Sequence, residues 1–258
     1  QGQQLWWDDT ETAQAGFTLA AGDMDGDGRD ELIATRSGQN DLLIFLGSSM
    51  DPEHPVLSGW DLLLTGAEGT NALAIGEVDG DGSADLLVGS PGANAGGFTD
   101  AGQVYLVLGR DLSDGADLSD LSSFTLSGEE DSQGLSGALA LGDVDGDGLD
   151  DLVIGDSMAD APGREAGRVL VFTDISEGSP ALADADILLE GGVRSGQFGT
   201  SVAVLADIDG DGVSEVSGGA LDTDSGGTDS GTVAVWFGGA GLVSGYVSAA
   251  DIRVHGSD

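Results

Sequence analysis

Four short acidic loops in this chain carry carboxylates at alternate positions, a pattern that can hold a metal ion. Each loop has acids at its first, third, fifth and ninth positions and glycines at its fourth and sixth. Like charges this close together repel one another unless a cation lies among them. The predicted side-chain ligands are Asp23, Asp25, Asp27 and Glu31; Glu77, Asp79, Asp81 and Asp85; Asp143, Asp145, Asp147 and Asp151; and Asp207, Asp209, Asp211 and Glu215.

Calcium is the cation that suits these loops best. It accepts about six to eight oxygen ligands with loose angular demands, whereas magnesium needs a stricter octahedron. Zinc and copper prefer imidazole or thiolate, and the chain has two histidines and no cysteine. The backbone carbonyl at position 7 is expected to be a further ligand, which explains why that side chain varies. The residues there are Arg29, Ser83, Leu149 and Val213. The sequence therefore predicts four calcium ions per chain, one for each loop.

An EF-hand is the main alternative for a loop of this type. It requires a bidentate glutamate at position 12 and a following helix. The residues at position 12 are Ala34, Val88, Ile154 and Gly218, and none of these side chains can be a ligand. Each loop is followed instead by a short apolar run such as Asp85-Leu-Leu-Val-Gly, which is typical of a buried strand. We therefore expect the ninth-position acid to close the site and the loop to join two strands.

The spacing of the loops indicates a repeated structural unit. Their first ligands, at positions 23, 77, 143 and 207, are 54, 66 and 64 residues apart. Each copy contains four strand-like segments, one before the loop, one after it and two more separated by glycine or polar turns. No stretch shows a convincing helical period. Four short antiparallel strands per unit predict an all-β fold made of β-propeller blades.

The repeated residues carry a family resemblance. A small-apolar strand leads into Gly-Asp-x-Asp-Gly-Asp-Gly-x-x-Asp, then Leu-(Leu/Val)-(Val/Ile)-Gly, then a strand that begins like Gly-x-Val-Tyr. This pattern resembles the FG-GAP repeat of integrin α-subunit β-propellers and their bacterial relatives. The name-giving dipeptide survives as Phe198-Gly199, and the second half as Gly89-Ser-Pro91 or Gly218-Gly-Ala220. The resemblance covers about residues 15–256. It implies calcium loops that join the first two strands of each blade on one face of the disc.

The number of blades departs from the family, whose propellers are usually seven-bladed. The predicted blades are 15–66, 67–128, 129–191 and 192–258, and the last one runs into the start of the next turn. Residues 1–14 are predicted to hold the last strand of a preceding blade or a closing strand, Leu5-Trp-Trp-Asp-Asp-Thr. Because both ends resemble fourth strands, we expect part of a larger propeller or array. A self-contained four-bladed ring with a spare strand is the alternative.

An open array leaves unpaired blade faces that require a partner. We expect further repeats of the same polypeptide, another copy of the chain or a neighbouring subunit to cover them.

The composition is strongly acidic. The chain has 47 acidic residues against 7 arginines and no lysine, for a net charge of −40. Four bound calcium ions would leave about −32. A surface this negative repels nucleic acid and anionic membranes and suits salty, calcium-rich surroundings. We interpret the remaining acidity as favouring solubility, and an acidic face that binds a partner is the alternative.

Calcium loops of this kind fill best at the roughly millimolar levels found outside cells. The predicted location is therefore extracellular or at the cell surface, as a secreted protein. With no cysteine for disulfides, bound metal is expected to stabilise the fold instead. No apolar run is long enough to span a membrane, so membrane insertion is not expected. A signal peptide is also missing, which indicates a mature chain or a fragment.

No catalytic constellation stands out. The sequence lacks a Gly-x-Ser-x-Gly elbow, a phosphate loop and a His-Glu-x-x-His motif, and nearly all its close carboxylate pairs belong to the acidic loops. His54 and His255 are interpreted as lone polar residues without a chemical role. We therefore expect a module that binds protein or carbohydrate ligands in adhesion or extracellular assembly, and not an enzyme. The alternative is a non-catalytic propeller accessory to an enzyme elsewhere in the full-length polypeptide.

Overall fold

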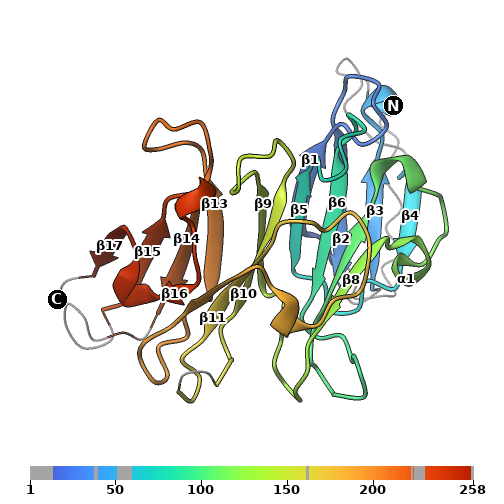
Figure 1. Cartoon of the computed structure of the whole chain (residues 1–258). Coiled ribbons are helices and arrows are strands. Elements are labelled where there is room, and N and C mark those ends of the chain that lie inside the picture. Colours follow the sequence, from blue (N-terminus) through green and yellow to red (C-terminus); the bar gives the residue numbers. More distant parts are fainter. Residues whose placement is uncertain are drawn as a thin grey trace.

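The computed structural model describes residues 14–37, 40–50, 60–160, 163–221, 223 and 230–256 of the 258-residue chain. Its strands form four sheets, each containing four strands that pair antiparallel in chain order. The predicted all-β fold of four-stranded propeller blades is confirmed. The sheets do not close into a ring: the first and the fourth lie at opposite sides of Figure 1. The predicted strand at Leu5–Thr10 and His54 lie outside the described residues.

The first two sheets come from the first half of the chain. The first sheet contains β1 (Gln14–Gly22), β2 (Glu31–Ser37), β3 (Asp41–Phe45) and β4 (Leu62–Thr65). The second contains β5 (Ala72–Gly76), β6 (Asp85–Ser90), β7 (Gln103–Val107) and β8 (Phe124–Ser127).

The last two sheets repeat this order. The third contains β9 (Ala138–Gly142), β10 (Asp151–Asp156), β11 (Arg168–Phe172) and β12 (Ile187–Glu190). The fourth contains β13 (Ser201–Leu205), β14 (Glu215–Ala220), β15 (Thr232–Trp236) and β17 (Ile252–His255). The short strand β16 (Gly245–Tyr246) pairs parallel with β12 and so ties the fourth unit to the third sheet.

The hydrophobic core lies between consecutive sheets. The second strands β6, β10 and β14 are buried along their whole length, as their apolar runs indicate. The second residue of each of the first three acidic loops also enters this core: Met24, Val78 and Val144 are buried among side chains of the following sheet. Its counterpart in the fourth loop, Ile208, is 52% exposed.

The first strands lie side by side in the order β1, β5, β9 and β13. Close packing here explains the glycine before each of the first three loops. A Cβ added to Gly22 would collide with Ile75, and one added to Gly142 would collide with Val204. The equivalent residue of the fourth sheet is Ala206, which is exposed.

Helical structure is confined to single turns in the described part of the chain. The one α-helical turn, α1 (Leu118–Leu121), is capped by Asp117, whose carboxylate accepts a hydrogen bond from the Ser119 amide at 3.1 Å. The 3-10 turns are η1 (Gly47–Ser49), η2 (Gly109–Asp111), η3 (Leu182–Asp184), η4 (Gly239–Gly241) and η5 (Val247–Ala249). Segments this short show no hydrophobic periodicity, so they could not be predicted from the sequence. No helix among the described residues has the length and apolar character needed to cross a membrane.

Candidate metal centres

The four acidic loops connect the first strand of each sheet to the second, as predicted, and lie at the upper end of the sheets in Figure 1. Their glycines at positions 4 and 6 all have left-handed φ values, between 72° and 96°. Residues with a Cβ rarely adopt this conformation, which explains why glycine occupies both positions in every copy. The turn brings the alternate carboxylates back toward one another.

Three acids in each loop place one carboxylate oxygen each within 4.8 Å of the others. The groups are Asp23, Asp25 and Asp27; Glu77, Asp79 and Asp85; Asp143, Asp145 and Asp151; and Asp207, Asp209 and Glu215. The predicted ligands Glu31, Asp81, Asp147 and Asp211 lie outside these groups. All four groups combine carboxylates at positions 1 and 3 with a third acid, and they are positioned to hold divalent cations.

Hydrogen bonds within each loop hold these carboxylates in place. The position-1 carboxylate accepts from the position-6 glycine amide, at 2.7 Å in the second loop and 2.9–3.0 Å in the others. The position-3 carboxylate accepts from the position-5 amide at 3.0–3.1 Å. The position-5 carboxylate accepts from the position-7 amide at 2.8–2.9 Å. In the last three loops the other oxygen of the position-1 acid also accepts from the position-4 glycine amide, at 2.5–2.7 Å. The loop is therefore organised before any cation enters it.

The position-9 acids are completely buried. Glu31, Asp85, Asp151 and Glu215 have no exposed surface, and each accepts a hydrogen bond from the position-2 amide of its loop at 2.7–3.0 Å. Burial raises the pKa of Asp85 to about 6 and that of Asp151 to about 7. None of the ion pairs found among the described residues involves these four acids. A buried carboxylate without a counter-ion is unfavourable, so these positions favour a cation.

Two buried carboxylate oxygens in the loops have no hydrogen-bond donor, Asp23 Oδ1 and Asp151 Oδ1. In the first and second sheets, the position-9 acid receives a second hydrogen bond from the Gly47 or Gly109 amide, at 3.1 Å and 3.0 Å. Asp151 lacks this second donor. Buried polar atoms are nearly always satisfied, so an orphaned oxygen in an all-oxygen cluster fits a hard cation as its missing partner.

The second loop already holds a cationic side chain. The Arg110 guanidinium forms ion pairs with Asp79 and Asp81, the latter at 2.7 Å, and its hydrogen bond lowers the pKa of Asp81. Sequence reasoning did not identify Arg110, which lies in η2 about thirty residues from its partners. The only signal in the sequence was that Arg110, one of just seven arginines, follows shortly after a predicted third strand.

Backbone hydrogen bonds join consecutive loops. The amide of the eighth residue in one loop donates to the carbonyl of the first residue in the preceding loop. These pairs are Ala84 to Asp23 at 2.8 Å, Asp150 to Glu77 at 2.8 Å and Ser214 to Asp143 at 3.0 Å. The four loops therefore form one continuous row along the end of the sheets.

Parts of this chain are similar to known repeat proteins. Residues 69–107 and 137–172 match the FG-GAP repeat family. Integrin alpha-5 of Xenopus laevis is 33% identical over 156 residues, which cover 58% of this chain and 13% of that protein. Phosphatidylinositol-glycan-specific phospholipase D of Rattus norvegicus is 33% identical over 178 residues, covering 62% and 20%. Human integrin alpha-IIb is 31% identical over 154 residues, covering 57% and 13%. The chain thus spans at most about a fifth of the length of these relatives.

Among solved structures, the exotype rhamnogalacturonan lyase YesX aligns with 91% of this chain and 42% of its own, at 16% identity and a TM-score of 0.47. A likeness this low carries no argument about function.

Proposed function

Because this chain is an FG-GAP repeat protein similar to integrin α subunits over more than half its length, we propose that it is a calcium-binding β-propeller module. Its place is outside the cell or at the cell surface, in adhesion, ligand binding or structural assembly. The observation that carries this proposal is the group of converging carboxylates in every acidic loop, with a fully buried acid at position 9. The alternative, a propeller accessory to an enzyme, gains no support over this one from the comparisons.

Each site would be formed by the carboxylates at positions 1, 3, 5 and 9 and by the carbonyl at position 7, the residues that the sequence predicts. Calcium would supply the positive charge that the buried position-9 acid lacks. The chain contributes the geometry: the two glycines turn the loop, and the position-1 and position-3 acids are held by amides of the same loop. The position-9 acid begins the second strand, so a filled site would fasten the loop to the buried centre of the sheet.

Apolar side chains on the outer faces of the first and fourth sheets support a role within a larger assembly. Phe17 and Leu19 on β1 are 68% and 58% exposed, and Val254 on β17 is 60% exposed. The counterparts of Val254 in the first three sheets, Leu64, Leu126 and Leu189, are completely buried, and those of Leu19 on β5 and β9, Leu73 and Leu139, pack against the core. We propose that further blades of the same kind cover these faces, because the repeat itself presents the matching surface at every internal junction.

Calcium titration of the metal-free chain by isothermal calorimetry tests the proposal. We expect four sites, with dissociation constants of about 10⁻⁴–10⁻³ M, as in extracellular modules. Asp145→Asn should remove one site, whereas Asp174→Asn, an acid outside the loops, should leave all of them. A stoichiometry of two or fewer in the wild-type chain would contradict the proposal.

A further inference from the structure

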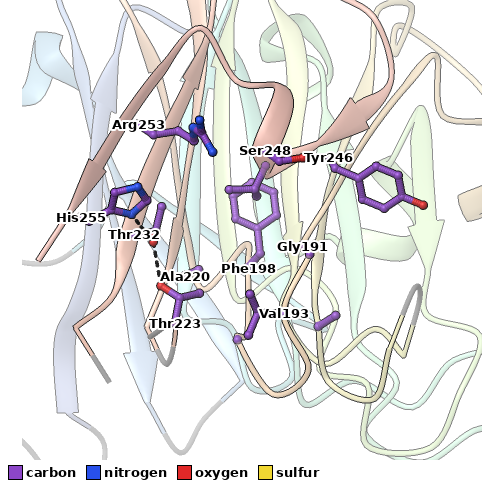
Figure 2. Close-up of a pocket in the computed structure, with 14 residues that line it drawn as sticks. Gly191, Val193, Phe198, Ala220, Thr223, Thr232, Tyr246, Ser248, Arg253 and His255 are labelled. Atoms are coloured by element: carbon purple, nitrogen blue, oxygen red, sulfur yellow. Dashed lines mark hydrogen bonds between the residues drawn. The ribbon is translucent and has the colours of Figure 1, made fainter. Parts of the chain in front are cut away.

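A cavity of about 500 Å³ lies between the third and fourth sheets. It is bordered by Ala220, the last residue of β14, and by Thr232, the first residue of β15. The acidic loop of the fourth sheet precedes β14, so the cavity is at the opposite end of the sheets from the predicted calcium sites. Its volume falls in the range of about 300–1,000 Å³ that is usual for small-molecule sites. Phe198 and Val193 supply apolar walls (Figure 2).

The corresponding space between the second and third sheets is filled. There Asp156 and Arg168 face each other in register and form an ion pair at 2.8 Å, and the Gln133 amide donates to Asp156 at 2.8 Å. The same register pair in the fourth sheet is Ala220 and Thr232. The alanine replaces an acid and the threonine replaces an arginine, which leaves room for a ligand.

A third replacement enlarges the cavity. Gln133 and Gly196 occupy equivalent places, because the residues two positions later, Leu135 and Phe198, make the same backbone hydrogen bond to the preceding turn. Gly196 has no side chain to reach across the gap. The cavity therefore results from three specific substitutions relative to the neighbouring blade, rather than from loose packing in general.

The outer strand adds cationic and polar groups to this space. Arg253 and His255 on β17 line the cavity, whereas the residues in the same register on β12 are Leu188 and Glu190. Figure 2 shows His255 bonded to Thr232, with 3.0 Å between Nδ1 and Oγ1. None of the described acids forms an ion pair with Arg253. Sequence reasoning gave His255 no chemical role, because its neighbours across the sheets were not visible.

We propose that this cavity binds a carboxylate-bearing ligand of about one sugar ring, such as an acidic monosaccharide unit. The planar Arg253 guanidinium suits a carboxylate, which it can bind with two parallel hydrogen bonds. The Ser248 hydroxyl also borders the cavity and can bond to a hydroxyl group of such a ring, whereas the Tyr246 hydroxyl points away from the other lining residues in Figure 2. The Phe198 ring offers an apolar surface for the ring's carbon atoms.

The strongly negative net charge does not prevent this interaction. At physiological ionic strength the Debye length is about 8 Å, so exposed charges at the far end of the sheets are largely screened. The charge near the ligand decides its binding, and in the cavity the Asp156 carboxylate of the neighbouring blade is replaced by an alanine while Arg253 is added.

A further blade packed against the fourth sheet would leave the cavity open. Successive side chains on a strand point to opposite faces, so Ile252 and Val254 face away from the cavity that Arg253 and His255 line. The proposal therefore does not depend on how the array continues.

The test is calorimetric titration of the full chain in calcium-containing buffer with three probes: glucuronate, glucose and inorganic sulfate. We expect saturable binding of glucuronate, at least about tenfold tighter than that of glucose or sulfate. Arg253→Leu, which introduces the residue found at the equivalent place in β12, should weaken glucuronate binding at least about tenfold. Arg194→Leu removes the same charge from the loop that borders the cavity without lining it, and should bind like the wild type.

Ala220→Asp combined with Thr232→Arg provides a second test, because this pair restores the ion pair of the third sheet and fills the cavity. We expect loss of glucuronate binding with an intact cooperative melt. The proposal is overturned if glucuronate does not bind the wild-type chain, if glucose or sulfate binds as tightly, or if Arg253→Leu retains wild-type affinity.

Discussion

The backbone amide of Ala84 donates a hydrogen bond of 2.8 Å to the carbonyl oxygen of Asp23, and so fastens the second acidic loop to the first. Asp23 is the first predicted ligand of its loop, and Ala84 is followed by the buried predicted ligand Asp85. The same bond joins the third loop to the second and the fourth to the third. Ordering of one loop should therefore favour the ordered state of its neighbours.

We expect this row of hydrogen bonds to couple the calcium sites. Disabling the second loop by Asp79→Asn should remove one site and also weaken the remaining sites, by about fivefold at a coupling free energy near 1 kcal/mol. Disabling the fourth loop by Asp209→Asn should have a smaller effect, because that loop is bonded to one described neighbour only. Calorimetry of both variants measures the difference. Equal wild-type affinities at all remaining sites would show that the loops are independent.

Removing calcium should destabilise the fold. A ligand that binds only the folded state adds about 2.7 kcal/mol per site at a hundredfold excess over its dissociation constant. Chelation with EDTA should therefore lower the melting temperature strongly, and added calcium should restore it. Magnesium at the same concentration serves as the control and should restore less. A melting temperature that is unchanged in EDTA would contradict calcium binding by these loops.

Asp151→Asn should change stability in opposite directions with and without calcium. In EDTA the buried Asp151, with its pKa raised to about 7, keeps its proton more tightly when folded than when unfolded. Its contribution to stability is therefore fully present below about pH 4 and is lost as the pH rises through about 7, by at most about 4 kcal/mol.

The asparagine variant cannot ionise, so in EDTA it should be the more stable protein at pH 8. In saturating calcium it should be the less stable one, since it lacks a charged ligand. Chemical denaturation at pH 5 and pH 8 in both buffers checks the sign. The same order of stability in EDTA and in calcium would refute the assignment of Asp151 as a ligand.

Arg110→Gln should strengthen calcium binding at the second loop. The Arg110 guanidinium pairs with Asp79 and Asp81 there, and a cation entering the loop must displace it. We expect severalfold tighter binding at one site of the four. Arg164→Gln, which removes an exposed arginine paired with Glu165 outside the loops, is the matched control. Unchanged or weaker binding in Arg110→Gln would mean that the arginine supports the loop rather than competing for it.

The open end of the row should make the isolated chain associate. Ile208 is 52% exposed, although its counterparts in the first three loops are buried. We expect small-angle scattering to show a molecular mass that rises with concentration, and Ile208→Asp to reduce that rise. Glu130→Gln, at an exposed site outside the end faces, is the control. A monodisperse wild-type chain with the dimensions of a compact four-bladed ring would contradict this prediction.

Much of the fold and of the candidate metal centres could be predicted from the sequence, because both depend on local patterns. Acids at positions 1, 3 and 5 around two glycines specify a tight turn whose hydrogen bonds run between residues two to five apart. Short apolar runs after each loop likewise specify buried strands. The spacing of the copies then indicates blades, and the family resemblance to FG-GAP repeats is confirmed by residues 69–107 and 137–172. The blade boundaries themselves stay a prediction.

Contacts across the blades were decided only by the tertiary structure. The ion pairs of Arg110 join two separate turns, and the hydrogen bond between Ala84 and Asp23 joins two sheets. The missing donor at Asp151 Oδ1 also depends on which backbone amides lie near it in the folded chain. The cavity beside Arg253 likewise exists because Gly196, Ala220 and Thr232 meet in one place, although they are distant in the chain. Such contacts depend on strand register and on how one sheet packs against the next. A periodic sequence pattern determines which faces are buried, but not which side chains meet there.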